Sequence, residues 1–333
     1  MRIKYNLVEI YGFIFLGSAF LLIYFQENLT IHNLVFSESF LTFNMIFLSI
    51  FIEAIPFVLI GVFIAGFIQV FVSEDHLKRL IPKNKFSAVL ISCLIGALFP
   101  ACECGIVPIV RRLIAKGVPL FAGVGFLLTG PLINPIVIFS TYMAFGENIK
   151  MAGLRMGLGL LIALVITGIV CILFKSNQMK PSKLSFVSSE LNESKRPIGV
   201  RMKAMFVHAI DEFFDMGKFL VLGAILAAFV QTYVSTKSLL DVGGTDVLAS
   251  TFVMMGLAYL LSLCSEADAF IAASFHHLFS DTSLLGFLIY GPMLDLKNTI
   301  MLLAVFRFVF VLTLMVIITG TVAGILYLVH PWI

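Results

Sequence analysis

The stretch FPACECGIVP, from Phe99 to Pro108, decides how the rest of the chain can fold. It holds two cysteines, a glutamate, a glycine and two prolines, and strongly apolar sequence flanks it on both sides. Proline and glycine interrupt helices, and thiols select soft or borderline metal ions. The stretch therefore predicts a broken helix that carries metal-type ligands at membrane depth.

The composition is that of an integral membrane protein. Hydrophobic residues make up 60% of the 333-residue chain and charged residues 12%, whereas a soluble domain carries about 25% charged residues. The apolar segments run for about 20 residues or more without the alternation of a barrel, so we expect a polytopic all-α membrane protein. The net charge of +3 forms no basic patch, and no nucleic-acid partner is expected. The five cysteines, an odd number in apolar surroundings, argue against a disulfide framework.

Four segments organise the chain. We expect an additional N-terminal transmembrane helix and loop over residues 1–40, a first repeat over 41–174, a cytoplasmic linker over 175–206 and a second repeat over 207–333. The linker is the only long polar stretch, and its Ser, Lys and Asn content is typical of a flexible connection. The chain is thus predicted to consist of two apolar halves joined by one polar segment.

The two halves resemble each other in sequence. FIEAIPFVLIGVFIAGFIQVF (51–71) aligns with FFDMGKFLVLGAILAAFVQTY (213–233), and further blocks follow in the same order. Each block has its polar or helix-breaking residue matched, which indicates an ancestral duplication. The matched positions are Glu53 with Asp215, Cys102 with Cys264, and GPLIN (130–134) with GPMLD (291–295).

The positions of the basic residues predict how the halves are oriented, because Lys and Arg favour the cytoplasmic side. If residues 86–113 crossed the membrane once, Arg111, Arg112 and Lys116 would face outside. We therefore expect a re-entrant hairpin that enters and leaves on the cytoplasmic side, with arms of roughly 20 Å of helix. The corresponding hairpin, residues 247–275, would then enter from outside, and the halves would be inverted repeats. If both hairpins are full spans, the repeats would be parallel.

The two hairpin tips carry the residues that we expect to contact a substrate. Non-helical backbone at membrane depth is tolerated only inside protein or around a wet cavity. Three thiols and one carboxylate could form a four-coordinate site for a transported ion such as zinc, with ligand distances of about 2.0–2.3 Å; no resident cofactor is expected. The predicted metal ligands are Cys102, Cys104, Cys264 and Glu266, and the predicted substrate-binding residues are these four together with Glu103, Asp268, Asn134 and Asp295.

Other charged residues in apolar segments are functional candidates by default. Glu53 and Asp215, at matched positions, are candidates for proton coupling or are acids at helix ends near the headgroups. Two lysines are expected to neutralise acids, Lys297 beside Asp295 and Lys218 beside Asp215. The residues expected to mark cytoplasmic helix ends are Arg111, Arg112, Arg155 and Arg307.

At FPACECGIVP followed by GPLINP, and at LCSEADAF followed by GPMLD, the chain resembles the YraQ-type permease family, which includes methylarsenite efflux permeases. The resemblance implies a multi-pass permease of the bacterial plasma membrane. The arsenical branch carries a CSC-like core, whereas Glu103 stands between the two cysteines here. This difference makes the chain more similar to the Gram-positive branch described as one subunit of a two-component permease complex. That branch implies a second membrane subunit as partner.

The sequence thus predicts a permease that moves a thiophilic small substrate, a divalent transition metal and by preference zinc. Efflux of a trivalent arsenical or other metalloid is the first alternative. An intramembrane thiol redox enzyme and a non-transporting subunit of a permease complex are further alternatives, although HExxH, GxSxG and phosphate-loop motifs are absent from the sequence. Besides the second subunit, the lipid bilayer and a homo-oligomer are the expected partners.

Overall fold

A computed structural model describes residues 38–73, 82, 84–99, 102–180, 197–233 and 246–332. The described residues are helical, apart from their connections and an isolated bridge between Met179 and Phe306. The N-terminal helix predicted within 1–40, and residues 181–196 of the predicted linker, lie outside the described residues. The end of that linker is helical, because α10 begins at Ile198.

The helices follow the same order in both halves: one long helix, two short ones, two separated by a break, and another long one. In the first half these are α2 (Glu38–Phe71), α4 (Lys85–Ala97), α5 (Glu103–Ala115), α6 (Leu120–Ile133), α7 (Pro135–Ala144) and α8 (Ile149–Leu173). In the second half they are α10 (Ile198–Tyr233), α12 (Val247–Leu261), α13 (Ser265–Ser274), α14 (Asp281–Met293), α15 (Leu296–Val305) and α16 (Phe308–Val329), followed by the 3-10 turn η2 (His330–Trp332).

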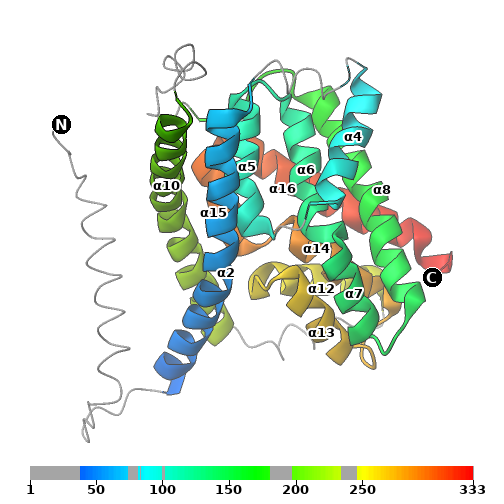
Figure 1. The fold of residues 1–333 in the computed structure, drawn as a ribbon. Helices are drawn as coiled ribbons and strands as arrows, with labels where there is room; N and C mark the ends of the chain where they lie inside the picture. Colours follow the sequence, from blue (N-terminus) through cyan, green and yellow to red (C-terminus); the bar gives the residue numbers. More distant parts are fainter. Residues whose placement is uncertain are drawn as a thin grey trace, which may run out of the picture.

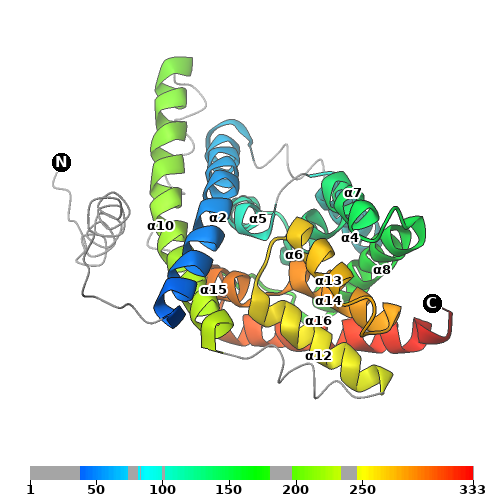
Figure 2. The same cartoon turned by 90° about the horizontal axis from the view of Figure 1, so that it is seen from below.

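Six stretches of the described chain are long and apolar enough to cross a membrane. Two of them, Leu120–Ala144 and Asp281–Val305, contain the breaks α6–α7 and α14–α15, and 78% of the residues in their most apolar windows are buried. The other four, which contain α2, α8, α10 and α16, are 33% to 39% buried in the same windows. The first parts of these broken helices, α6 and α14, therefore lie in the centre of the bundle, as the view from below also shows (Figure 2).

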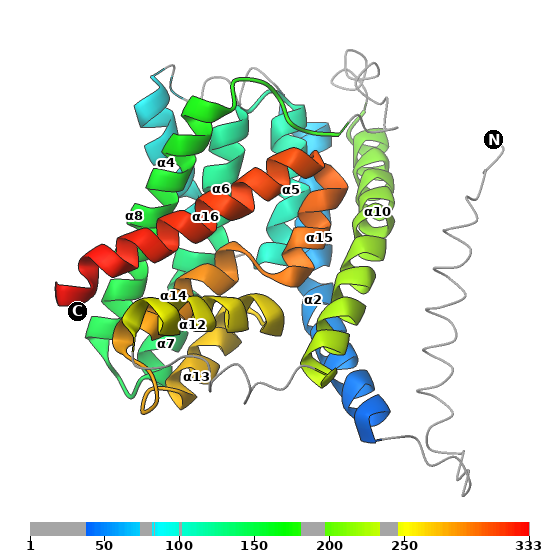
Figure 3. The same ribbon diagram turned by 180° about the vertical axis from the view of Figure 1, so that it is seen from behind.

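The two long helices α2 and α10 lie side by side and run in opposite directions (Figures 1 and 3). In Figure 1, α2 runs upward and α10 runs downward. The short helices α4 and α5 lie in the upper part of the molecule, whereas α12 and α13 lie in the lower part (Figures 1 and 3). Phe47 and Ile50 of α2 pack on Ala224, Ala227 and Ala228 of α10 in one buried cluster.

The breaks follow from local sequence in the same way in both halves. Asn134 ends α6 and caps α7, where its Oδ1 accepts from Val137 N at 2.9 Å, and Pro135 fills the first helical position, where no hydrogen bond is lost. Asp295 caps α15, where its Oδ1 accepts from Asn298 N at 2.5 Å. Both breaks place a polar capping side chain in the buried centre of the bundle.

Glycine at position 105 lets the first hairpin approach α2 closely. A Cβ atom on Gly105 would lie 2.6 Å from the carbonyl oxygen of Phe57, a separation that real Cβ atoms do not show. A Cβ atom on Gly61, one turn further along α2, would lie 2.2 Å from the carbonyl oxygen of Gly105. The glycine of CECG thus fixes the position of the cysteine-bearing turn against α2.

Candidate functional site

The break between α4 and α5, called the first break below, brings two thiols and a carboxylate into the protein interior. Cys102 is the N-cap of α5, and Glu103 and Cys104 begin that helix. All three side chains are buried, and the two thiols lie next to each other. Pro100 and Ala101, at the tip before them, lie outside the described residues. The three residues predicted to contact a substrate at this break, Cys102, Glu103 and Cys104, are therefore all buried in the folded chain.

The break between α12 and α13, called the second break below, contains a residue with a left-handed backbone conformation. Ser262 ends α12 with φ of 46°, and its hydroxyl donates to Tyr259 O at 3.1 Å and accepts from Leu296 N at 3.1 Å. The same residue therefore closes α12 and accepts a hydrogen bond from the first residue of α15. Cys264 follows as the N-cap of α13, with its sulfur accepting from Ala267 N at 3.5 Å.

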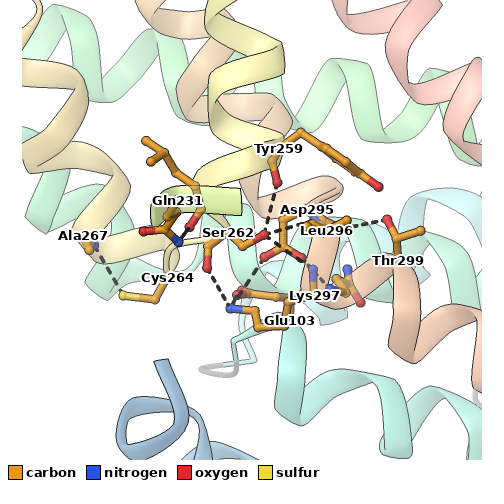
Figure 4. Close-up of polar contacts among 12 residues, drawn as sticks. Glu103, Gln231, Tyr259, Ser262, Cys264, Ala267, Asp295, Leu296, Lys297 and Thr299 are labelled. Carbon is orange, nitrogen blue, oxygen red and sulfur yellow. Dashed lines mark hydrogen bonds and ion pairs between the residues drawn. The ribbon is translucent and has the colours of Figure 1, made fainter. Parts of the chain in front are cut away.

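Lys297, which follows the break between α14 and α15, contacts residues of the first and second breaks (Figure 4). Its ammonium lies 3.1 Å from Glu103 Oε1, 3.3 Å from the carbonyl oxygen of Ser262 and 3.5 Å from Asp295 Oδ2. Glu103 is 1% exposed and Lys297 is 4% exposed, so this link is shielded from solvent. The predicted pair of Lys297 with Asp295 is confirmed. The link from Lys297 to Glu103, which connects the two halves, was not predicted.

Asn134 and Asp295, which are equivalent in the alignment of the halves, differ in their surroundings. Asp295 caps its helix and also faces the Lys297 ammonium. The Asn134 amide is used locally, since its Oδ1 caps α7 and its Nδ2 donates to Gly130 O at 3.5 Å. Of the two, only Asp295 therefore contacts the charged group formed by Lys297 and Glu103.

The four predicted metal ligands lie in two groups. Cys102 and Cys104 adjoin each other at the first break, whereas Cys264 at the second break lies beside the carboxylate of Glu53 from α2. Glu266 is half-buried in the first turn of α13. Among the described residues, no three or more His, Cys, Asp and Glu side chains are arranged to hold a metal ion. The four-ligand site remains a prediction.

Asp215, the second candidate for proton coupling, lies between two cations. Its carboxylate accepts from Lys218 Nζ at 2.6 Å and from Arg111 Nη1 at 2.7 Å. The predicted pair of Lys218 with Asp215 is thus confirmed. Arg111 also donates to Glu212 at 3.0 Å, and Arg112 forms a buried ion pair with Glu212. Glu212, which sequence reasoning missed, therefore ties the cysteine-bearing helix α5 to α10.

The prediction that Arg155 marks a cytoplasmic helix end is wrong. Arg155 is 0% exposed, and its guanidinium donates to Thr141 Oγ1 at 2.6 Å and to the carbonyl oxygen of Ser265 at 3.1 Å. Its charge faces Asp268 and Glu266. The reason is that the Thr141 hydroxyl and the Ser265 carbonyl of the second break accept hydrogen bonds from the guanidinium, which offsets part of its loss of solvation. Arg307, by contrast, is exposed at the start of α16.

The chain matches curated proteins over most of its length. It is 54% identical over 278 residues to "UPF0718 protein YcgR" of Bacillus subtilis, covering 83% of this chain and 93% of that protein. It is 40% identical over 279 residues, 80% of this chain and 88% of the relative, to the "Putative two-component membrane permease complex subunit" of Streptococcus mutans. "UPF0718 protein MJ0584" of Methanocaldococcus jannaschii is 25% identical over 124 residues, 37% of this chain and 33% of its own.

No solved structure matches the chain. The family described as "Predicted permease" matches residues 39–329, which include both halves and all the breaks described above. With six membrane-competent stretches among its described residues, the molecule is a multi-pass protein of the plasma membrane. The chain therefore belongs to the ArsP_1 family of predicted permeases.

Proposed function

We propose that the chain is a permease that moves a thiophilic small substrate, a divalent transition metal with zinc preferred, through a site at the helix breaks. The observation that carries this proposal is the buried pair of thiols, Cys102 and Cys104, at a break beside the charged link of Glu103 with Lys297. Thiolates bind zinc strongly. A carboxylate and an ammonium beside them can exchange partners when a cation enters.

We infer that the halves are inverted repeats that alternate access to this site. The shared order of helices and the opposite directions of α2 and α10 support the inference. So do the two hairpins, α4–α5 and α12–α13, which lie in opposite parts of the molecule. Transporters built in this way place their substrate site where broken helices meet, because unpaired backbone groups there can contact the substrate.

Zinc would take ligands from both halves. In this proposal, Cys102 and Cys104 contribute the first pair, and Cys264 and Glu266 complete the coordination when the breaks close on the ion. Thiols must lose their protons to bind zinc. Glu53 lies beside Cys264 and is the acceptor that we propose for its proton. Asp215 is held by Arg111 and Lys218, so we assign it to the contact between α5 and α10.

Measurement of metal bound to the purified full-length protein tests the proposed substrate. We expect wild-type protein loaded with zinc and then desalted to retain it, and the double substitution Cys102→Ser with Cys104→Ser to lose at least about 90% of it, because a hydroxyl is a far poorer zinc ligand than a thiolate. Cys93→Ser with Cys171→Ser is the matched control, since Cys93 contacts Thr167 away from the breaks and Cys171 lies near the end of α8.

Three outcomes of the zinc measurement are informative. Equal zinc in both double variants contradicts a thiol site at the first break. Retention of a trivalent arsenical in place of zinc, with the same dependence on Cys102 and Cys104, would replace the proposed metal with a metalloid. No thiol-dependent element in any sample would count against both substrates.

We also propose that the chain works together with a second membrane subunit. The support is the Streptococcus mutans relative, whose name describes a subunit of a two-component membrane permease complex. Protein extracted from native membranes in mild detergent should contain this 36.8-kDa chain and a different multi-pass protein in equal amounts, measured by mass spectrometry. A particle whose protein mass is one or several copies of this chain alone contradicts the proposal.

A further inference from the structure

The first turn of α13 carries a buried group of oxygen atoms that no described residue satisfies. Ser265 and Asp268 are each 1% exposed. Neither carboxylate oxygen of Asp268 has a hydrogen-bond partner, and neither does the hydroxyl oxygen of Ser265. Residues three apart lie on the same face of a helix. Three unpartnered oxygen atoms therefore belong to residues on one face of α13 at the second break.

Arg155, the cation that faces Asp268, does not satisfy these oxygen atoms. Its two terminal nitrogens donate to Thr141 Oγ1 and to the backbone carbonyl of Ser265, and its Nε has no partner. No ion pair joins Arg155 to Asp268. A buried carboxylate without donors is expensive in free energy. A proton or a bound cation is needed to neutralise it.

The charges buried at the breaks point to a cation. Three carboxylates are buried there, those of Glu103, Asp268 and Asp295, against two cationic groups, those of Lys297 and Arg155. Lys297 contacts both Glu103 and Asp295, whereas no cationic side chain forms a hydrogen bond with Asp268. One negative charge is therefore in excess, and half-buried Glu266 adds to it. A monovalent cation bound by Asp268 would offset one of these negative charges.

The end of α14 beside Asp268 also favours a cation. A Cβ atom on Gly291 would lie 2.8 Å from Asp268 Oδ2, so this oxygen lies against the last turn of α14. The C-terminal end of a helix is the negative end of its dipole, which repels a carboxylate and attracts a cation. Broken helices in transporters bind sodium at such ends. Carboxylate, hydroxyl and carbonyl oxygens are the ligands of hard cations.

We propose that Asp268 and Ser265 form a binding site for a monovalent cation, sodium, distinct from the thiol pair at the first break. The role of this ion as the one whose gradient drives transport rests on the proposed function above. Binding of the ion does not rest on it, because none of the thiols takes part in the site. The two proposals can therefore fail separately.

Thermal unfolding of the purified full-length protein tests the site without knowledge of the transported substrate. We expect sodium chloride to raise the Tm of the wild type by about 3 °C or more relative to choline chloride at equal ionic strength, with saturation, because an ion that binds only the folded state stabilises it. Asp268→Asn should abolish the increase, and Ser265→Ala should raise the half-saturating sodium concentration several-fold. Asp211→Asn removes an exposed acid on α10 and should keep the full increase.

Further variants in the same unfolding experiment distinguish the sodium site from the thiol site. Cys102→Ser with Cys104→Ser should keep the sodium-dependent increase even where zinc is lost, which separates this site from the proposed function. If Asp268→Asn does not fold, Asp268→Glu and Ser265→Ala still report the site through altered half-saturation. An unchanged Tm of the wild type in sodium, an equal increase in potassium, or a full increase in Asp268→Asn would each overturn the proposal.

Discussion

Replacement of Lys297 by methionine should lower the free energy of unfolding by about 3–5 kcal/mol, because it leaves two buried carboxylates without their cation. Glu103 lies 3.1 Å from the ammonium and Asp295 lies 3.5 Å from it, and both acids are 1% exposed. Methionine has nearly the same length, so the loss reports charge more than volume. The measurement is the unfolding midpoint of purified protein in detergent, together with the yield of folded protein.

Lys218→Met is the matched control for Lys297. The Lys218 side chain is 46% exposed and pairs with Asp215 in one helix, where such a pair contributes about 0–1 kcal/mol. Glu103→Gln should recover part of the stability lost in Lys297→Met, since it removes one of the unpaired charges. Equal effects of the two lysine substitutions, or additive effects of Lys297→Met and Glu103→Gln, would contradict the buried link.

Replacement of Glu212 by glutamine should destabilise the contact between α5 and α10 by a similar amount, about 3–5 kcal/mol. Glu212 is the acid that both Arg111 and Arg112 contact, and its side chain is 1% exposed. Glutamine keeps the size of the side chain but removes the charge. We expect faster hydrogen exchange of the α5 amides as well as a lower unfolding midpoint, because α5 is held to α10 through these arginines.

Asp215→Asn serves as the control for Glu212. Its side chain is 28% exposed and pairs with only one of the two arginines, so a smaller loss of about 1 kcal/mol is expected. If exchange rates in α5 stay unchanged in Glu212→Gln, the ion pairs do not hold this helix in place.

The parts of the fold that depend on neighbouring residues were predictable from the sequence. The capping residues Asn134 and Asp295 start new helices locally, so the breaks could be located without knowledge of the tertiary structure. The long apolar runs that span the membrane follow from composition in the same way. Near pairs such as Lys218 with Asp215 were also within reach, because the two residues lie on one helix face.

The charged centre could not be predicted, because its members meet only after the halves pack. Glu103 and Lys297 are separated by 194 positions, and no local pattern in the sequence pairs them. Arg155 was misjudged because a basic residue near a helix start is usually a headgroup contact, and the carbonyl oxygen that it binds comes from Ser265 in the other half. Glu212 lies just before the aligned block 213–233, so the comparison of the two halves does not single it out.

Lys297 has no equivalent in the first half of the chain. The alignment that matches Asn134 with Asp295 places Ile136 where the second half has Lys297. Two identical halves in the inverted arrangement that we propose would give inward-facing and outward-facing states of equal energy. A charge bridge anchored in one half removes that degeneracy, because it can favour only one of the two states. The resting protein would then have a preferred side of opening before any gradient acts on it, and divergence after duplication would be the origin of that preference.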